Sequence, residues 1–159
     1  MSDHVETFEI AVNGQRRRAA VEADATLLTW LRDGLQATGT KRGCNQGVCG
    51  SCTVMIDGWP QRACLSLAAA CEGREVRTVE GYGDDAVMRT LQRRFAEGGA
   101  VQCGFCTSGM LISARRLLAD SPRPDEAEVR AALSGNLCRC TGYKKIVDAV
   151  LLAAEELAP

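Results

Sequence analysis

The first half of the chain alternates hydrophobic and polar positions with a period of two, which predicts β-strands. Residues 5–12 alternate in this way and end at Asn13-Gly14, a pair typical of tight hairpin turns. A return strand is therefore expected over residues 19–22. The same pattern predicts further short strands over residues 52–56 (followed by an Asp57-Gly58 turn), directly before Cys64, and over residues 75–79.

One short helix is expected between the two hairpins. Thr26 is a candidate N-cap, and leucines at helical spacing over residues 27–35 share one face. A loop rich in glycine and cysteine follows over residues 39–52. Two hairpins with a helix between them predict a small α+β sheet domain over residues 1–80.

The second half changes to the 3.6-residue period of amphipathic helices. Four helices are expected: over residues 84–95, from a candidate cap at Thr107 to Ala119, from Pro124 to about Gly135, and from Tyr143 to Ala154. We place Pro124 at the first helical position of the third helix, with Asp125 and Glu126 in its first turn. Four helices with short connections predict a small bundle over residues 84–159, and Gly81-Tyr82-Gly83 is the expected linker.

Length and charge exclude several classes of protein. The 159 residues suffice for one ordinary domain or two small ones. The net charge of -1 argues against a nucleic-acid binder, and no apolar run is long enough to span a membrane. The first residues, Met1 to His4, lack the basic and apolar regions of an export signal, so we expect a cytoplasmic protein.

Nine cysteines are unusual in a chain of this length. A secreted disulfide framework would account for them, but it requires an export signal. Ligation of a metal or an iron–sulfur cluster in a reducing compartment requires none. Aromatic residues make up only 4% of the chain, so the core is expected to be small and aliphatic, with bound inorganic centres adding to its stability.

The first cysteine set has the spacing of a plant-type [2Fe–2S] site. Four and then two residues separate Cys44, Cys49 and Cys52, and Cys64 is the expected fourth ligand. Glycines in this loop let the backbone approach a bulky cluster and direct N–H groups at its sulfurs. The alternatives are a zinc site and unligated buried thiols, but zinc sites favour paired C-x2-C motifs and do not require the glycines.

The second set combines Cys103 and Cys106 with Cys138 and Cys140. In an extended C-x-C segment both thiols point the same way, and Arg139 points elsewhere. Each pair is expected at a helix terminus, where N–H groups favour thiolates. Zinc is an open alternative for this set taken alone, and the neighbouring ferredoxin-like set favours a second iron–sulfur cluster.

The other candidate residues carry little chemistry. We expect Cys71 to be a buried thiol, with replacement of Cys64 as fourth ligand as the alternative. His4 is the only histidine and lies near the N-terminus. The basic runs at residues 16–18 and at Arg115-Arg116 are expected on solvated faces or against a partner subunit. The sequence shows no phosphate-binding loop, nucleophile elbow or paired catalytic carboxylates, so we assign no catalytic residue.

Three segments carry a resemblance to a known family. Residues 43–53 (GCNQGVCGSCT), 102–110 (QCGFCTSGM) and 135–143 (GNLCRCTGY) resemble the iron–sulfur subunits of molybdenum hydroxylases, the xanthine oxidase and aldehyde oxidoreductase family. The resemblance covers nearly the whole chain. It implies an N-terminal β-grasp (plant-type ferredoxin-like) domain and a C-terminal four-helix domain, each holding one [2Fe–2S] cluster. Ser108 stands where the family usually has proline, and we expect only a small local effect.

The resemblance also implies partners and a direction for electron flow. A large subunit would carry molybdopterin, as the cytosine dinucleotide in bacteria, and a medium subunit would carry FAD. A dimer of such heterotrimers, a heterohexamer, is expected. Gln102 and Cys140 would lie against the pterin. Electrons from substrate oxidised at molybdenum would pass through the second cysteine set to the first and on to FAD.

Several functions remain open on the sequence alone. The motifs look most like subunits of bacterial N-heteroaromatic hydroxylases, and carbon monoxide, aldehyde and aryl-CoA enzymes are alternatives. A free-standing two-cluster ferredoxin-like carrier is a competing hypothesis, but such carriers are usually strongly acidic and this chain is not. A zinc-stabilised interaction module would be colourless, whereas an iron–sulfur protein is brown.

Overall fold

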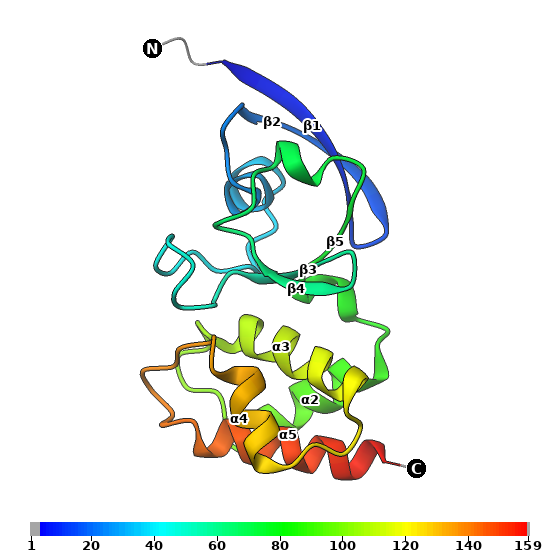
Figure 1. Cartoon of the computed structure of the whole chain (residues 1–159), viewed down its shortest axis with the longest axis vertical. Helices are drawn as coiled ribbons and strands as arrows, with labels where there is room; N and C mark the ends of the chain where they lie inside the picture. The colour runs from blue at the N-terminus through cyan, green and yellow to red at the C-terminus, as the bar shows by residue number, and fades with distance from the viewer. Residues whose placement is uncertain (1–3, 159) are drawn as a thin grey trace.

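The computed structural model describes residues 4–158 and shows a sheet-bearing part stacked on a helical part (Figure 1). The expectation that the first residues lack an export signal falls mainly on Met1 to Asp3, which lie outside the described residues. In the part of the chain that the structure describes, no helix is both long and apolar enough to cross a membrane.

The first hairpin joins β1 (Val5–Val12) to β2 (Gln15–Glu22). Asn13 and Gly14 have φ angles of 53° and 77°, which suit a tight turn between twisted strands. This turn places Gln15 directly opposite Val12, so pairing begins at once. The return strand therefore starts earlier than the predicted residue 19.

Three further strands complete a five-stranded mixed sheet in the order β2-β1-β5-β3-β4. They are β3 (Thr53–Ile56), β4 (Trp59–Arg62) and β5 (Glu75–Arg77). The β1–β5 pair is parallel and the other pairs are antiparallel. The Asp57-Gly58 turn forms as predicted, and the last strand ends at Arg77, before the predicted residue 79.

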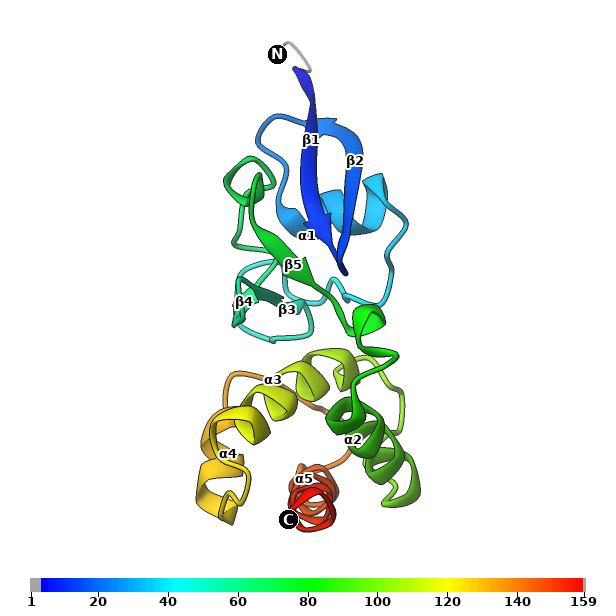
Figure 2. The ribbon, with the colours of Figure 1, turned by 90° about the vertical axis from the view of Figure 1, so that its right-hand side faces the viewer.

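A short helical segment packs across this sheet. Helix α1 (Leu27–Thr29) begins at Thr26, whose hydroxyl accepts a hydrogen bond from Thr29 N at 3.2 Å, and it continues as a π-helical turn, Trp30–Gly34. Figure 2 shows α1 beside the β1–β2 hairpin. Its buried side chains join strand residues in one core, whose largest fully buried members are Trp30, Ile10, Leu27, Leu28, Leu31 and Ile56.

Four longer helices form the second part, as the 3.6-residue period predicts. They are α2 (Ala86–Glu97), α3 (Thr107–Asp120), α4 (Glu126–Leu133) and α5 (Lys144–Leu157). Figure 2 shows them surrounding a common interior. Side chains from all four meet in a second core, whose largest fully buried members are Phe95, Met88, Leu91, Met110, Ile112 and Ile146.

Two helix starts differ from the sequence-based expectation. Asp125 is the N-cap of α4, because it accepts from Glu128 N while the Glu128 side chain accepts from Asp125 N. Pro124 therefore precedes the cap and is not the first helical residue. Thr107 is the first residue of α3 and caps nothing, because Cys106 already has helical backbone angles.

The segment predicted as a linker is a folded junction. A 3-10 helix spans Val79–Tyr82, and the Tyr82 ring is buried beneath the guanidinium groups of Arg77 (4.0 Å) and Arg115 (5.7 Å). Arg115 also pairs with Asp85, the N-cap of α2, at 2.8 Å. Arg115 therefore does not lie on a solvated face as predicted, because it connects α2, α3 and the junction.

The sheet rests directly on α3, where strands β3 and β4 contact it (Figure 1). Met55 of β3 is buried in the helical core. Arg116 of α3 stacks on Trp59 of β4 at 4.3 Å and donates to the carbonyl of Gly58 at 3.1 Å. Arg116 of this predicted surface run thus holds the two parts together, and Arg115 fastens the junction between them.

Candidate metal centres

The first cysteine set lies where a loop enters the β3–β4 hairpin. Cys44 and Cys49 lie in the loop and are half-buried, whereas Cys52 precedes β3, Cys64 follows β4 and both are buried. Because the hairpin is antiparallel, its two ends meet, and Ala63 N donates to the carbonyl of Cys52 at 3.2 Å. The four predicted thiols are therefore brought together by one loop and one hairpin.

Backbone amides of the loop point at its sulfurs. The Cys44 Sγ accepts from Cys49 N at 3.3 Å and from Gln46 N at 3.5 Å, which lowers the pKa of the Cys44 thiol to about 6. The Cys49 Sγ accepts from Cys44 N at 3.4 Å. Burial raises the pKa of Cys52 to about 11, and the neighbouring Cys64 thiol adds to this effect. The loop favours thiolates, whereas the buried thiols require a cationic ligand to lose their protons.

Two glycines make this close packing of the loop possible. A Cβ on Gly43 would lie 2.8 Å from the Cys49 Sγ, inside van der Waals contact. Gly50 has a φ of 73°, and a Cβ there would overlap the carbonyl oxygen of Gly135. Side chains at these positions would displace the sulfurs or separate the loop from the helical domain.

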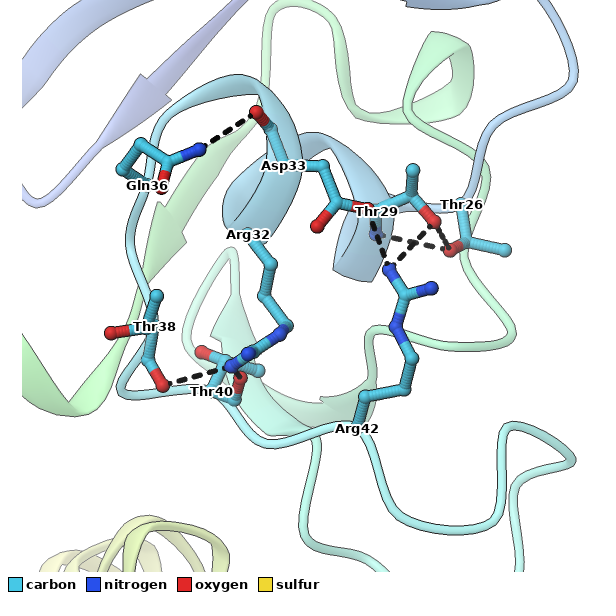
Figure 3. Close-up of polar contacts among 8 residues, drawn as sticks. All are labelled: Thr26, Thr29, Arg32, Asp33, Gln36, Thr38, Thr40 and Arg42. Carbon is cyan, nitrogen blue, oxygen red and sulfur yellow. Dashed lines mark hydrogen bonds and ion pairs between the residues drawn. The ribbon is translucent and has the colours of Figure 1, made fainter.

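Two arginines tie the start of this loop to the helical segment above it (Figure 3). Arg32 reaches from the helix to the carbonyls of Thr38 and Thr40, at 3.0 and 2.9 Å. Arg42 reaches back from the loop to the Asp33 carboxylate at 3.0 Å. These contacts fix the entry to the cysteine loop although it has no regular secondary structure.

The second set is formed by two loops of the helical domain. Cys103 and Cys106 occupy the turn that leads into α3, with Cys106 at its N-cap position. Cys138 and Cys140 lie in the connection between α4 and α5. The Cys140 and Cys103 sulfurs are 3.5 Å apart, and Cys106 lies beside Cys138. The structure thus brings all four predicted thiols together.

Burial and hydrogen bonds also shift the pKa values of thiols in the second set. Burial raises the pKa of Cys106 to about 12, with the neighbouring Cys138 thiol adding to it. Burial also acts to raise the pKa of Cys138, but hydrogen bonds that include the Thr141 hydroxyl outweigh it and lower that pKa. The Cys138 Sγ and Thr141 Oγ1 are 3.1 Å apart, and Cys138 N donates to the Tyr143 hydroxyl at 2.8 Å.

The arrangement of the thiols suits a binuclear centre. Within residues 4–158, no group of three or more His, Cys, Asp or Glu side chains is arranged to hold a metal ion. Each set instead divides into two neighbouring pairs: Cys44 with Cys49, Cys52 with Cys64, Cys103 with Cys140, and Cys106 with Cys138. A [2Fe–2S] cluster takes four thiolates, two for each iron. The donor chemistry and the paired arrangement therefore fit such a cluster in each set.

One small cavity of about 200 Å³ is lined by residues of both cysteine loops. Its lining includes Cys49 from the first set and all four cysteines of the second. Leu137 N, next to Cys138, donates to the carbonyl of Cys49 at 2.8 Å. One hydrogen bond therefore connects the backbones of the two cysteine loops.

The remaining predicted site residues fall in different surroundings. Gln102 and Cys140 are both exposed, and Cys140 contacts Cys103, the neighbour of Gln102. Cys71 is 1% exposed in the core of the sheet domain, and burial raises the pKa of its thiol. Ser108 is buried in α3, and its hydroxyl has no hydrogen-bond partner among the described residues.

Sequence reasoning assigned no role to three polar residues in or near the cysteine loops: Thr141, Asn136 and Arg62. Thr141 follows the C-x-C segment directly, so a hydroxyl three residues after Cys138 was a usable local signal. Asn136 and Arg62 act across the domain boundary, through contacts with Gly50 and Gly135. No local pattern identifies such long-range pairs.

Two family models of iron–sulfur domains match the chain. A 2Fe-2S iron-sulfur cluster binding domain matches residues 10–81, and a [2Fe-2S] binding domain matches residues 78–151. Together they indicate two [2Fe–2S] clusters in one chain.

Curated relatives and solved structures match the chain over nearly its full length. The nicotine 6-hydroxylase small subunit of Paenarthrobacter nicotinovorans is 52% identical over 156 residues, which are 98% of this chain and 93% of that one. The caffeine dehydrogenase subunit gamma of a Pseudomonas species is 44% identical over 153 residues, 94% and 90% of the two chains. A chain of quinoline 2-oxidoreductase from Pseudomonas putida 86 superposes with a TM-score of 0.89 at 48% identity, with 96% of each chain covered.

This structural likeness confirms the expected α+β architecture, a β-grasp sheet domain followed by a helical domain. Identity at this level over the whole length also confirms the resemblance seen in the three cysteine motifs. The chain therefore belongs to the iron–sulfur subunits of the molybdenum hydroxylases, the electron-transfer components of these oxidoreductase complexes.

Proposed function

We propose that this chain relays electrons between a molybdopterin centre and FAD in partner subunits, with one [2Fe–2S] cluster in each cysteine set. The observation that carries the proposal is the pairing of eight thiols in two sets, which approach each other where Cys49 and the second set line one cavity. Residues 1–80 and 84–159 are the proposed domains, which the two hydrophobic cores support.

The proposed ligands of the first cluster are Cys44, Cys49, Cys52 and Cys64. Placement of the Cys64 thiol beside Cys52 favours it as the fourth ligand. Cys71 is instead packed among apolar side chains of the sheet core. The proposed ligands of the second cluster are Cys103, Cys106, Cys138 and Cys140.

The residues of the chain prepare these sites for a cluster. Each bound [2Fe–2S] cluster would accept and release one electron, which suits a relay between centres that exchange two. The amide groups of Cys49 and Gln46 stabilise negative charge on the Cys44 sulfur. The burial of Cys52 and Cys106 keeps water away from one side of each site.

Exposure supports the order of the relay. Gln102, Cys103 and Cys140 are exposed together on the helical domain, so a pterin held by a large partner subunit could reach this face. We therefore place the second set toward the molybdenum subunit, with Gln102 and Cys140 against the pterin. The first set, with its exposed neighbour Val48, then faces a medium FAD subunit.

The proposed substrate is an N-heteroaromatic compound, because relatives named for nicotine, caffeine and quinoline match nearly the whole chain. Relatives named for aldehydes also match, so an aldehyde is the second candidate. We further propose the cytosine dinucleotide form of molybdopterin, a dimer of heterotrimers and a cytoplasmic location, where reduced thiols are available for cluster assembly.

The substrate proposal is tested with the complex that this chain forms with its partner subunits. The anaerobic complex is mixed with quinoline, nicotine, nicotinate, caffeine, acetaldehyde and carbon monoxide in separate stopped-flow runs. The proposal predicts that an N-heteroaromatic compound bleaches the visible iron–sulfur absorption and then the flavin. Bleaching by acetaldehyde or carbon monoxide alone would exclude this substrate class.

The relay itself is tested by substitution of a first-set cysteine. Cys49→Ser is expected to slow flavin reduction by substrate while iron–sulfur signals of the second set are still reduced. Cys71→Ser is the matched control, because it changes a buried thiol of the same domain outside both sets. Flavin reduction at the control rate in Cys49→Ser would contradict a relay through the first set.

A further inference from the structure

We propose that Asn136 is a positioning residue that holds the two cysteine loops in one fixed relation and thereby sets the electronic coupling between the clusters. This inference rests on the proposed function, because it presupposes a cluster in each loop. Asn136 is only 2% exposed and lies two residues before Cys138. A buried amide at this place requires hydrogen-bond partners.

Both ends of the Asn136 amide are used, and its partners come from different segments. Its Nδ2 donates to the carbonyl of Gly50 at 3.0 Å, in the first cysteine loop between Cys49 and Cys52. Its Oδ1 accepts from the Ser113 hydroxyl of α3 at 2.8 Å. Because one end donates and the other accepts, these two contacts fix the rotation of the amide.

Two glycines make room for the amide. A Cβ on Gly50 or on Gly109 of α3 would overlap the Asn136 side chain or the Gly50 carbonyl. The first loop, the start of α3 and the second loop therefore meet without intervening side chains. Such close backbone approach is what short, fixed separations between two centres require.

The neighbours of Asn136 reinforce the same junction. Leu137 N donates to the carbonyl of Cys49 at 2.8 Å, and the Arg62 guanidinium donates to the carbonyl of Gly135. Three consecutive residues of the second loop thus bond to the sheet domain or its cysteine loop. A junction that served stability alone could lie anywhere on the β3–α3 contact, but this one lies between the two thiol sets.

Electron tunnelling between two centres depends steeply on their separation and on bonded contact between them. Loss of the Asn136 amide leaves the Gly50 carbonyl and the Ser113 hydroxyl without this partner in a buried site. The loops are then free to separate or to adopt several spacings. The expected consequence is weaker coupling between clusters that are each still intact.

The test uses Asn136→Ala in the complex with its partner subunits, with Val129→Ala as the matched control. Val129 is fully buried in α4, so its truncation weakens the helical core at a position outside both cysteine loops. Both complexes are reduced and frozen, and the spin–spin splitting between the two cluster signals is measured by electron paramagnetic resonance (EPR) at matched iron content. The inference predicts reduced or broadened splitting in Asn136→Ala and wild-type splitting in Val129→Ala.

Wild-type splitting in an Asn136→Ala complex with full cluster content would overturn the inference. If that variant loses a cluster, Ser113→Ala decides, because it keeps the Asn136 side chain and removes only the bond that orients it. Unchanged splitting in Ser113→Ala would then also count against the inference. Absence of two iron–sulfur signals in the wild-type complex would instead refute the proposed function.

Discussion

The hydroxyl of Thr141 is expected to raise the reduction potential of the second cluster. Its oxygen lies 3.1 Å from the Cys138 Sγ and accepts a hydrogen bond from Tyr143 N at 3.2 Å. Because the oxygen already accepts from that amide, its own proton can point at the sulfur. Reduction adds negative charge to the thiolate-bound cluster, so a donor to sulfur stabilises the reduced form more than the oxidised one.

The substitution Thr141→Val removes this donor and keeps the shape of the side chain. A hydrogen bond to a charged group contributes about 1.5–3 kcal/mol, and we take about 1 kcal/mol as the part that differs between the two redox states. For a one-electron couple, about 59 mV corresponds to a tenfold change in the equilibrium constant, or about 1.4 kcal/mol. The midpoint potential is therefore expected to fall by about 40 mV.

The assay is a redox titration of the complex followed by EPR, which resolves the two clusters. The first cluster is an internal reference, because Thr141 lies in the second cysteine loop. Thr141→Ser keeps the hydroxyl and should retain the wild-type potential. An unchanged second-cluster potential in Thr141→Val, or an equal shift of both clusters, would refute the reasoning.

Three further outcomes are expected. Cys71→Ser should leave both EPR signals intact, whereas Cys64→Ser should alter one of them. The reverse pattern would make Cys71 the fourth ligand and Cys64 the buried thiol. Gln102→Ala should slow reduction of the clusters by substrate when the rate is normalised to molybdenum and iron content. A normalised rate equal to that of the wild type would contradict the proposed contact of Gln102 with the pterin. Burial acts to raise the pKa of Asp85, but hydrogen bonds from Arg115 and a backbone amide outweigh it and lower that pKa. The ionised carboxylate therefore stabilises the fold above the unfolded pKa of about 3.9 and ceases to do so as pH falls through the folded value. Asp85→Ala should lower the free energy of unfolding, measured with denaturant, by about 1 kcal/mol at neutral pH. A loss of stability that does not shrink in acid would contradict this pH dependence.

Local patterns predicted most of the secondary structure because the signals were local. Asn13-Gly14 defines a turn through its own backbone preferences, and the helices follow from 3.6-residue periodicity. The predicted start of α4 was wrong because reciprocal hydrogen bonds between Asp125 and Glu128 define the N-cap. Pro124 is compatible with the first turn of a helix but does not fix where the helix begins. Arg115 was assigned to a solvated face because its partners come from segments distant in sequence.

The same distinction applies to the candidate sites. Cysteine spacing predicted which thiols the structure brings together, since each loop holds two or three of them. It could not show how the loops meet, because the contact of Asn136 with Gly50 spans 86 positions of sequence. The sequence cannot indicate the hydrogen bond from Leu137 N to the Cys49 carbonyl either, because any residue except proline can donate such a bond.

The central claim, two [2Fe–2S] clusters that relay electrons in one subunit, is tested most directly by EPR of the anaerobically purified complex, combined with metal analysis. The account predicts two distinct reduced iron–sulfur signals that integrate to equal spin, with about four iron and about four acid-labile sulfide per chain and no stoichiometric zinc. One iron–sulfur signal, together with two iron and one zinc per chain, would contradict it.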